Sequence, residues 1–148
     1  MYQHLLLPTD GSPLSDAALE RGLALARELG AKVTILTVVE PFYMFTASEE
    51  HLGETREQYE KFAREAARGI LQSAKERAAE LGLDAKVKPV GSEHPAQATT
   101  DAVDEHGCDL VAMASHGRRG VNALLLGSVT QRVLAHSTVP VLVFRPPA

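Results

Sequence analysis

Two apolar runs, His4-Leu-Leu-Leu-Pro8 and Lys32-Val-Thr-Ile-Leu-Thr-Val-Val39, flank a segment with the pattern of an α-helix. The helical segment begins at Ser12-Pro13, a capping hydroxyl followed by proline at the first helical position, and it runs to Gly30. Its apolar residues recur at helical spacing: Leu14, Ala18, Leu25 and Leu29. The flanking runs are apolar at consecutive positions, which is typical of strands covered on both faces of a parallel sheet. The stretch therefore predicts a strand–helix–strand unit.

The rest of the chain repeats this alternation of strand and helix patterns. Further strands are predicted at Ala85–Val90, Asp109–Ala114 and Val139–Phe144. Further helices are predicted at about Gly53–Leu81, at Pro95–His106, and from near Ser128 to Ser137. Strands that alternate with helices imply right-handed crossovers. We therefore expect a single domain over residues 1–148: an α/β fold of the doubly wound class, with a five-stranded parallel sheet and helices on both faces.

The longest predicted helix carries an apolar stripe that we expect to be buried. The stripe consists of Tyr59, Phe62, Ala66, Ile70, Ala74 and Leu81. Shortly before this helix, the run Pro41-Phe-Tyr-Met-Phe45 holds three of the chain's aromatic residues. The run either folds back onto the core beneath the long helix or forms a lid or a partner contact, because exposed apolar clusters usually have a function.

The composition is that of an ordinary globular protein, with 45% hydrophobic and 23% charged residues. The formal net charge of -4 argues against a nucleic-acid-binding domain, which usually carries a clustered basic face. The single cysteine, Cys108, excludes an internal disulfide, suits a reducing compartment and is expected to be a buried, inert thiol. The sequence has no signal-peptide or membrane-spanning pattern, so we expect a cytoplasmic protein.

Two loops that follow predicted strands are chemically distinctive. Ligands of open α/β sheets bind beyond the carboxyl ends of the strands, where the strand order reverses. The first loop, Pro8-Thr9-Asp10-Gly11-Ser12, is either a tight strand-to-helix turn or a turn whose Asp10 lines the rim of a polar ligand site.

The second loop follows the strand at Asp109–Ala114 and contains Ser115-His-Gly-Arg-Arg-Gly120 and then Gly127-Ser-Val-Thr-Gln131. Glycines let backbone N–H groups approach an anion closely. Ser128 and Gln131 have the spacing of a capping box, so the last helix should open at Gly127-Ser128, and a helix N-terminus favours phosphate. The pattern fits a triphosphate cradle, and it equally fits glycine turns with an ordinary N-cap.

These blocks together resemble the universal stress protein family of the UspA type. The resemblance covers the whole chain and rests on Leu6–Ser12, Leu36–Val39, Met113–Gly120, Leu124–Thr130 and Val139–Val143. The second loop resembles the motif of the ATP-binding branch of that family, which is Gly-x2-Gly-x9-Gly-[Ser/Thr]. Gly117 and Gly127-Ser128 match its second half, whereas Ala114 replaces the first glycine. An alanine at a negative φ changes such a site little, whereas a site that needs a positive φ would lose affinity.

The resemblance also implies a set of ligand contacts and an assembly. It places Gly117, Gly127 and Ser128 on the phosphates and ribose. Pro8, Thr9 and Asp10 would border the adenine and ribose, with Val38 or Val39 on the adenine face. Candidate contacts at the same site are Ala114, His116, Arg118, Arg119 and Val129. The family further implies a strand order of 3-2-1-4-5, which brings the two loops together, and a homodimer through the last strand, Val139–Phe144.

Three of these candidates also have ordinary structural explanations. Arg118 and Arg119 either neutralise phosphates or are simply solvated. His116 either orients a phosphate or hydrogen-bonds to the backbone, and no histidine has metal-ligand spacing with another His or Cys. We expect any metal to be Mg²⁺ carried on the nucleotide phosphates.

The sequence thus favours a stress-response regulatory protein that binds ATP, with slow hydrolysis or none, because it has no Walker motif. The alternative is a dimeric interaction module of the same fold that binds no nucleotide, and Ala114 keeps this alternative open. An enzyme of flavodoxin-like or receiver-like type is less favoured, because Trp is absent and the third predicted strand leads into Pro89-Val90-Gly91 without carboxylates.

Overall fold

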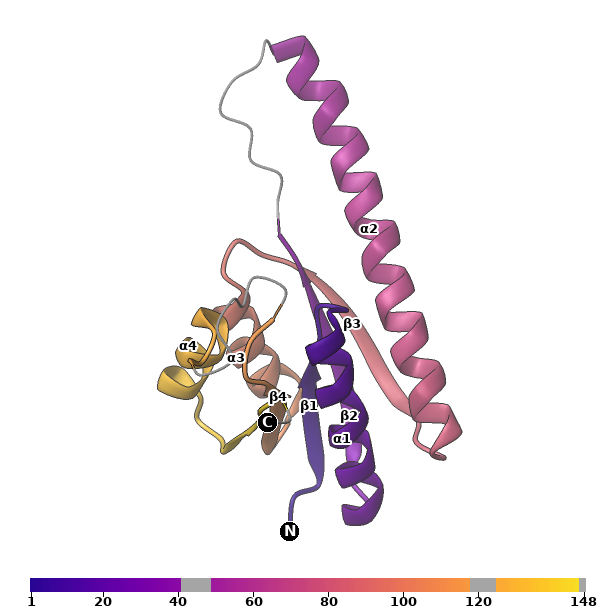
Figure 1. The fold of residues 1–148 in the computed structure, drawn as a ribbon, viewed down its shortest axis with the longest axis vertical. Coiled ribbons are helices and arrows are strands. Elements are labelled where there is room, and N and C mark those ends of the chain that lie inside the picture. The colour runs from indigo at the N-terminus through magenta and orange to yellow at the C-terminus, as the bar shows by residue number, and fades with distance from the viewer. Residues whose placement is uncertain (41–48, 118–124, 147–148) are drawn as a thin grey trace.

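The computed structural model describes residues 1–40, 49–117 and 125–146. Strands and helices alternate along the chain (Figure 1). In order they are β1 (His4–Pro8), α1 (Pro13–Leu29), β2 (Lys32–Val39), α2 (Glu49–Glu80), β3 (Ala85–Gly91), α3 (Pro95–His106), β4 (Leu110–Ala114), α4 (Ser128–His136) and β5 (Val141–Phe144).

All five strands form one parallel sheet in the order β3-β2-β1-β4-β5. The chain builds from β1 out to β3 and then returns to place β4 on the other side of β1. The strand order therefore reverses between β1 and β4, which is where ligands of such sheets bind. The predicted fold class and the strand order implied by the resemblance are both confirmed.

Helices cover both faces of the sheet (Figure 1). Neighbouring side chains of β1 point to opposite faces, so Leu5 and Leu7 pack beneath α1 and α2, while Leu6 packs on the side of α3 and α4. All three leucines are at most 1% exposed. The consecutive apolar residues of the predicted strands thus reflect a sheet that is buried on both faces.

Helix α1 begins and ends as its sequence predicts. Ser12 is the N-cap, and its hydroxyl oxygen accepts a hydrogen bond from the backbone N–H of Ser15 at 3.3 Å. Pro13 occupies the first turn, and Gly30 ends the helix in the left-handed region at φ 66°. This cap fixes the loop between β1 and α1, which forms part of the candidate site.

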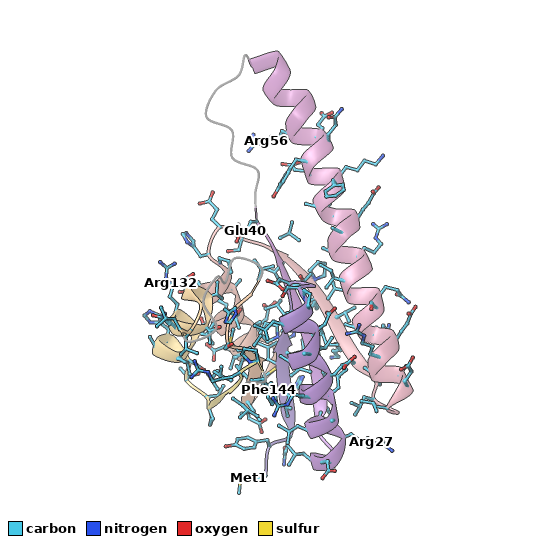
Figure 2. All side chains as sticks on the ribbon, viewed as in Figure 1. Met1, Arg27, Glu40, Arg56, Arg132 and Phe144 are labelled. Atoms are coloured by element: carbon cyan, nitrogen blue, oxygen red, sulfur yellow. The ribbon has the colours of Figure 1, made fainter. Side chains whose placement is uncertain are left out.

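Helix α2 corrects two predictions. It begins at Glu49, four residues before the predicted start, and its buried residues are Ala67, Leu71, Ala74 and Ala78 instead of the predicted stripe. Of that stripe only Ala74 is buried, whereas Phe62 is 72% exposed. Tyr59 and Phe62 lie in the N-terminal half of the helix, which also holds Arg56 and extends past the strands, so this half has no sheet to cover (Figures 1 and 2). Nearer the sheet, the buried face is turned by one residue from the predicted stripe.

Strands β4 and β5 both begin later than predicted, because side-chain oxygens accept backbone N–H groups next to their starts. Strand β4 begins at Leu110, since the Asp109 carboxylate accepts hydrogen bonds from the backbone N–H groups of Gln3 and His4. Strand β5 begins at Val141, because the backbone N–H of Val139 donates to Ser137 Oγ at 3.2 Å. No helix in the described part of the chain is long and apolar enough to span a bilayer.

Candidate functional site

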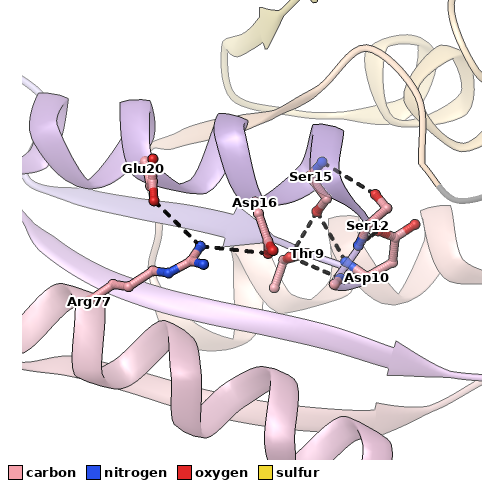
Figure 3. Close-up of polar contacts among 8 residues, drawn as sticks. Thr9, Asp10, Ser12, Ser15, Asp16, Glu20 and Arg77 are labelled. Atoms are coloured by element: carbon pink, nitrogen blue, oxygen red, sulfur yellow. Dashed lines mark hydrogen bonds and ion pairs between the residues drawn. The ribbon is translucent and has the colours of Figure 1, made fainter.

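The loop after β1 is held by a network of short polar contacts (Figure 3). Ser15 Oγ donates to Thr9 Oγ1 at 2.8 Å and accepts the backbone N–H of Asp10 at 3.1 Å. The backbone N–H of Ser12 donates to Asp10 Oδ1 at 2.9 Å. Thr9 is only 5% exposed, so its hydroxyl orders the turn and the Asp10 carboxylate is held at the carboxyl edge of the sheet.

The loop after β4 starts from Ser115, which is fully buried. Its backbone N–H donates to the carbonyl of Phe144 at 2.9 Å, and its carbonyl accepts the backbone N–H of Gly127 at 2.8 Å. Ser115 therefore joins the end of β4 to the end of β5 and to the start of α4. Ser115 was not among the residues predicted to form the site, although a serine directly after the apolar strand Leu110–Ala114 is a signal that the sequence contains.

Gly117 brings the loop after β4 against the loop after β1, and Gly127 packs against the start of its own loop. A Cβ atom at Gly117 would collide with Asp10 Oδ2, and one at Gly127 would lie 2.7 Å from His116 Cβ and 2.9 Å from its Cα. Neither glycine has a positive φ, so the reason for glycine at both positions is space and not conformation. The structure thus brings Asp10, His116, Gly117 and Gly127 together at the reversal between β1 and β4.

Helix α4 starts differently from the predicted capping box. Gly127 is the N-cap, Ser128 is the first helical residue, and no side chain among the described residues caps the helix. Gln131 instead donates its side-chain amide to the carbonyl of Leu126 at 2.7 Å. The exposed first turn therefore presents backbone N–H groups and a partial positive charge without a side-chain cap.

Ala114 fits its position without strain. It ends β4 in register with Phe144 and is 7% exposed. Its carbonyl accepts the hydroxyl of Thr130 at 2.9 Å, and no described residue other than glycine has a positive φ. The alanine that replaces the first motif glycine is therefore an ordinary strand residue.

The other candidate contacts are only partly placed. Pro8, Val38 and Val39 are half-buried at the carboxyl ends of the neighbouring strands β1 and β2, and Val129 lies exposed in the first turn of α4. Arg118, Arg119 and the aromatic run 41–45 lie outside the described residues. Among those that are described, no group of His, Cys, Asp or Glu could hold a metal ion.

Burial shifts pKa values at the opposite, amino end of the sheet. It raises the pKa of the Cys108 thiol to about 11, which agrees with the prediction of an inert thiol. Burial, together with the nearby charge of Lys32, lowers the pKa of His4, whose Nε2 lies 2.7 Å from Thr34 Oγ1. Both residues therefore lie away from the candidate site, which is at the carboxyl end of the sheet.

The chain is similar to known proteins over its whole length. Residues 1–145 match the model of the universal stress protein family. The Universal stress protein YxiE of Bacillus subtilis is 33% identical, with 98% of this chain and all of the relative covered. The Universal stress protein MJ0577 of Methanocaldococcus jannaschii is 27% identical, with 98% of this chain and 96% of the relative covered.

The fold of this chain is also similar to solved structures of family members. The MJ0577 structure covers 100% of this chain and 99% of its own at 27% identity and a TM-score of 0.79. A universal stress protein in complex with cAMP covers 99% of both chains at 28% identity and a TM-score of 0.73. The fold, the two glycine-bearing loops and these matches lead to one assignment: the chain belongs to the universal stress protein family.

Proposed function

We propose that this protein is a stress-response regulatory protein that binds ATP where the loops after β1 and β4 meet. The observation that carries the proposal is the N-terminus of α4, which no side chain in the described ranges caps and which opens at Gly127 against the loop that contains His116. A helix N-terminus without a cap is suited to phosphate, because its free N–H groups and its dipole both favour an anion. A related family member was solved in complex with cAMP, an adenine nucleotide.

The phosphate end of the proposed site consists of Gly117, Gly127 and the first turn of α4. Ser128 is exposed and its hydroxyl does not cap the helix, so both its hydroxyl and its backbone N–H are available to a phosphate oxygen. Mg²⁺, if bound, would be carried by the phosphates of the nucleotide and would neutralise part of their charge.

The nucleoside end consists of Pro8, Asp10 and the end of β2. The Asp10 carboxylate is an acceptor for ribose hydroxyls, and Val38 and Val39 offer apolar surface to the adenine. Thr9 supports this end indirectly, because its hydroxyl is occupied by Ser15.

Calorimetric titration of nucleotide-stripped protein with ATP and Mg²⁺ tests the proposal. We expect saturable binding by the wild type and a several-fold weaker affinity for Ser128→Ala, since one hydrogen bond to a charged group is lost. Ser73→Ala is the matched control, because Ser73 is an exposed helical serine in α2. Failure of the wild-type protein to bind ATP would contradict the proposal.

The proposal includes a homodimer that pairs through β5. The two edges of the sheet differ: β3 carries Lys86, Lys88 and Pro89, residues that discourage edge pairing, whereas β5 is the uncharged run Val141–Phe144. The β5 edge is therefore the one suited to pairing with a second copy.

A further inference from the structure

Ser115 connects three parts of the candidate site through its backbone and side chain. Its N–H and carbonyl are both occupied, by Phe144 of β5 and by Gly127 at the start of α4. Its side-chain oxygen lies 3.1 Å from Nδ1 of His116. Because Ser115 is fully buried and fixed at both backbone groups, its hydroxyl is a rigid partner for the His116 ring.

The direction of this hydrogen bond follows from the surroundings of the hydroxyl. Within the described part of the chain, His116 Nδ1 is the one hydrogen-bond partner of Ser115 Oγ. A buried hydroxyl proton without an acceptor is destabilising, so the proton of Ser115 is donated to Nδ1. A neutral imidazole that accepts at Nδ1 carries its own proton on Nε2.

The backbone position of His116 places the residue at the phosphate end of the proposed site. A Cβ atom at Gly127 would lie 2.7 Å from His116 Cβ, so the histidine lies directly against the N-terminus of α4. This is the end of the proposed site that favours phosphate. An N–H donor at Nε2 matches a phosphate oxygen, which is only an acceptor, whereas the other tautomer would present a lone pair to it.

We propose that Ser115 is a positioning residue of the nucleotide site, which fixes His116 in the tautomer that offers an Nε2–H donor to a phosphate oxygen. This inference rests on the proposed function for the identity of the ligand. The assignment of the ring tautomer rests only on the contacts of Ser115 and His116.

The first test is nitrogen NMR of the histidine rings in nucleotide-free protein at about pH 8, where an imidazole is neutral. The spectrum of the wild type should show the His116 proton on Nε2, and Ser115→Ala should shift the ring toward a mixture of tautomers. His116→Phe identifies the signal. A wild-type ring that is protonated on Nδ1 would overturn the inference, whatever the protein binds.

The second test is a double-mutant cycle measured by ATP titration. We expect His116→Phe to weaken binding about tenfold or more, because a hydrogen bond to a charged oxygen is lost. Ser115→Ala should weaken binding less, by a factor of about two or more, because only part of the ring population then offers the Nε2–H donor. The double variant should bind no more weakly than His116→Phe alone, since Ser115 acts through His116. Ser137→Ala, which loses a hydroxyl bonded to the backbone of Val139, serves as the control with unchanged affinity.

The outcomes separate the two proposals. Additive losses in the double variant, or unchanged affinity in Ser115→Ala, would overturn the positioning role while leaving ATP binding intact. Absence of ATP binding by the wild type would overturn the proposed function and the phosphate contact of His116. The ring spectrum, recorded without nucleotide, decides the tautomer in either case.

Discussion

Ala114 stands at the position where the nucleotide-binding motif of the family has its first glycine. It is a regular strand residue in register with Phe144, and its backbone has no positive φ. Glycine here would gain no conformation that the site needs, and it would leave the unfolded chain more freedom to lose on folding.

We therefore expect Ala114→Gly to lower the free energy of unfolding by about 0.5–1 kcal/mol and to leave the affinity for ATP unchanged. Urea denaturation measures the first quantity and calorimetric titration the second. A marked gain in affinity on introducing glycine would mean that the alanine methyl crowds the ligand, contrary to this expectation.

His4 makes stability depend on pH. Burial and the charge of Lys32 lower its pKa below the ordinary value of 6.5, so the unfolded chain takes up this proton at a higher pH than the folded protein does. The contribution of His4 to stability is therefore complete above pH 6.5 and is lost as the pH falls through 6.5 toward the lowered folded pKa.

The measurement is the free energy of unfolding of wild type and His4→Gln at about pH 7.5 and about pH 5.5. Glutamine can still hydrogen-bond to Thr34 but does not titrate. We expect the wild type to lose more stability than the variant on acidification, and an equal loss in both proteins would exclude His4 as the cause.

Among the elements, helix α2 has two halves that contribute differently to the stability of the fold. Leu71 is 4% exposed and lies in the core under this helix, whereas Phe62 is 72% exposed in the half that extends past the sheet. We expect Leu71→Ala to lower the free energy of unfolding by about 2–4 kcal/mol and Phe62→Ala by less than about 0.5 kcal/mol. Chemical denaturation measures the free energy of unfolding of both variants. Comparable losses would support the apolar stripe that the sequence pattern predicted to be buried.

The sequence predicted elements well where the signal is local. Consecutive apolar residues mark β1 and β2 at their observed bounds, and Ser12 and Gly30 mark the ends of α1. The buried face of α2 could not be predicted, because its apolar spacing does not reveal where the sheet ends. The N-cap of α4 was wrong by one residue, since the bond from Gly127 to the carbonyl of Ser115 links segments that periodicity does not relate.

The candidate site was predicted only in part for the same reason. Loop composition and family resemblance pointed to Asp10, Gly117 and Gly127, and the structure brings them together. They did not reveal that Thr9 is occupied by Ser15 or that Ser115 supports His116, because both facts depend on contacts across loops.

At the scale of the whole molecule, the exposed β5 edge predicts assembly. Leu142 is 39% exposed on this strand. Phe144 is held in place by Arg21 of α1, whose guanidinium lies 4.5 Å from the centre of the phenylalanine ring. We expect Leu142→Arg to convert a dimer into a monomer, because it places a charge in the paired edge. Leu29→Arg, at a similar exposure of 37% but in α1, is the control that should remain dimeric. A monomeric wild type, or a dimeric Leu142→Arg, would contradict β5 pairing.

The length of α2 affects how this assembly must be measured. Its 32 residues span about 48 Å, whereas a compact chain of 148 residues has a radius of gyration of about 15 Å, which corresponds to a sphere about 40 Å across. A particle with such a projection has more friction in water than a sphere of equal mass, so it elutes early from a sizing column. Apparent mass by elution volume would therefore overstate the number of subunits, and light scattering or sedimentation, which report mass independently of shape, are the measurements that count them.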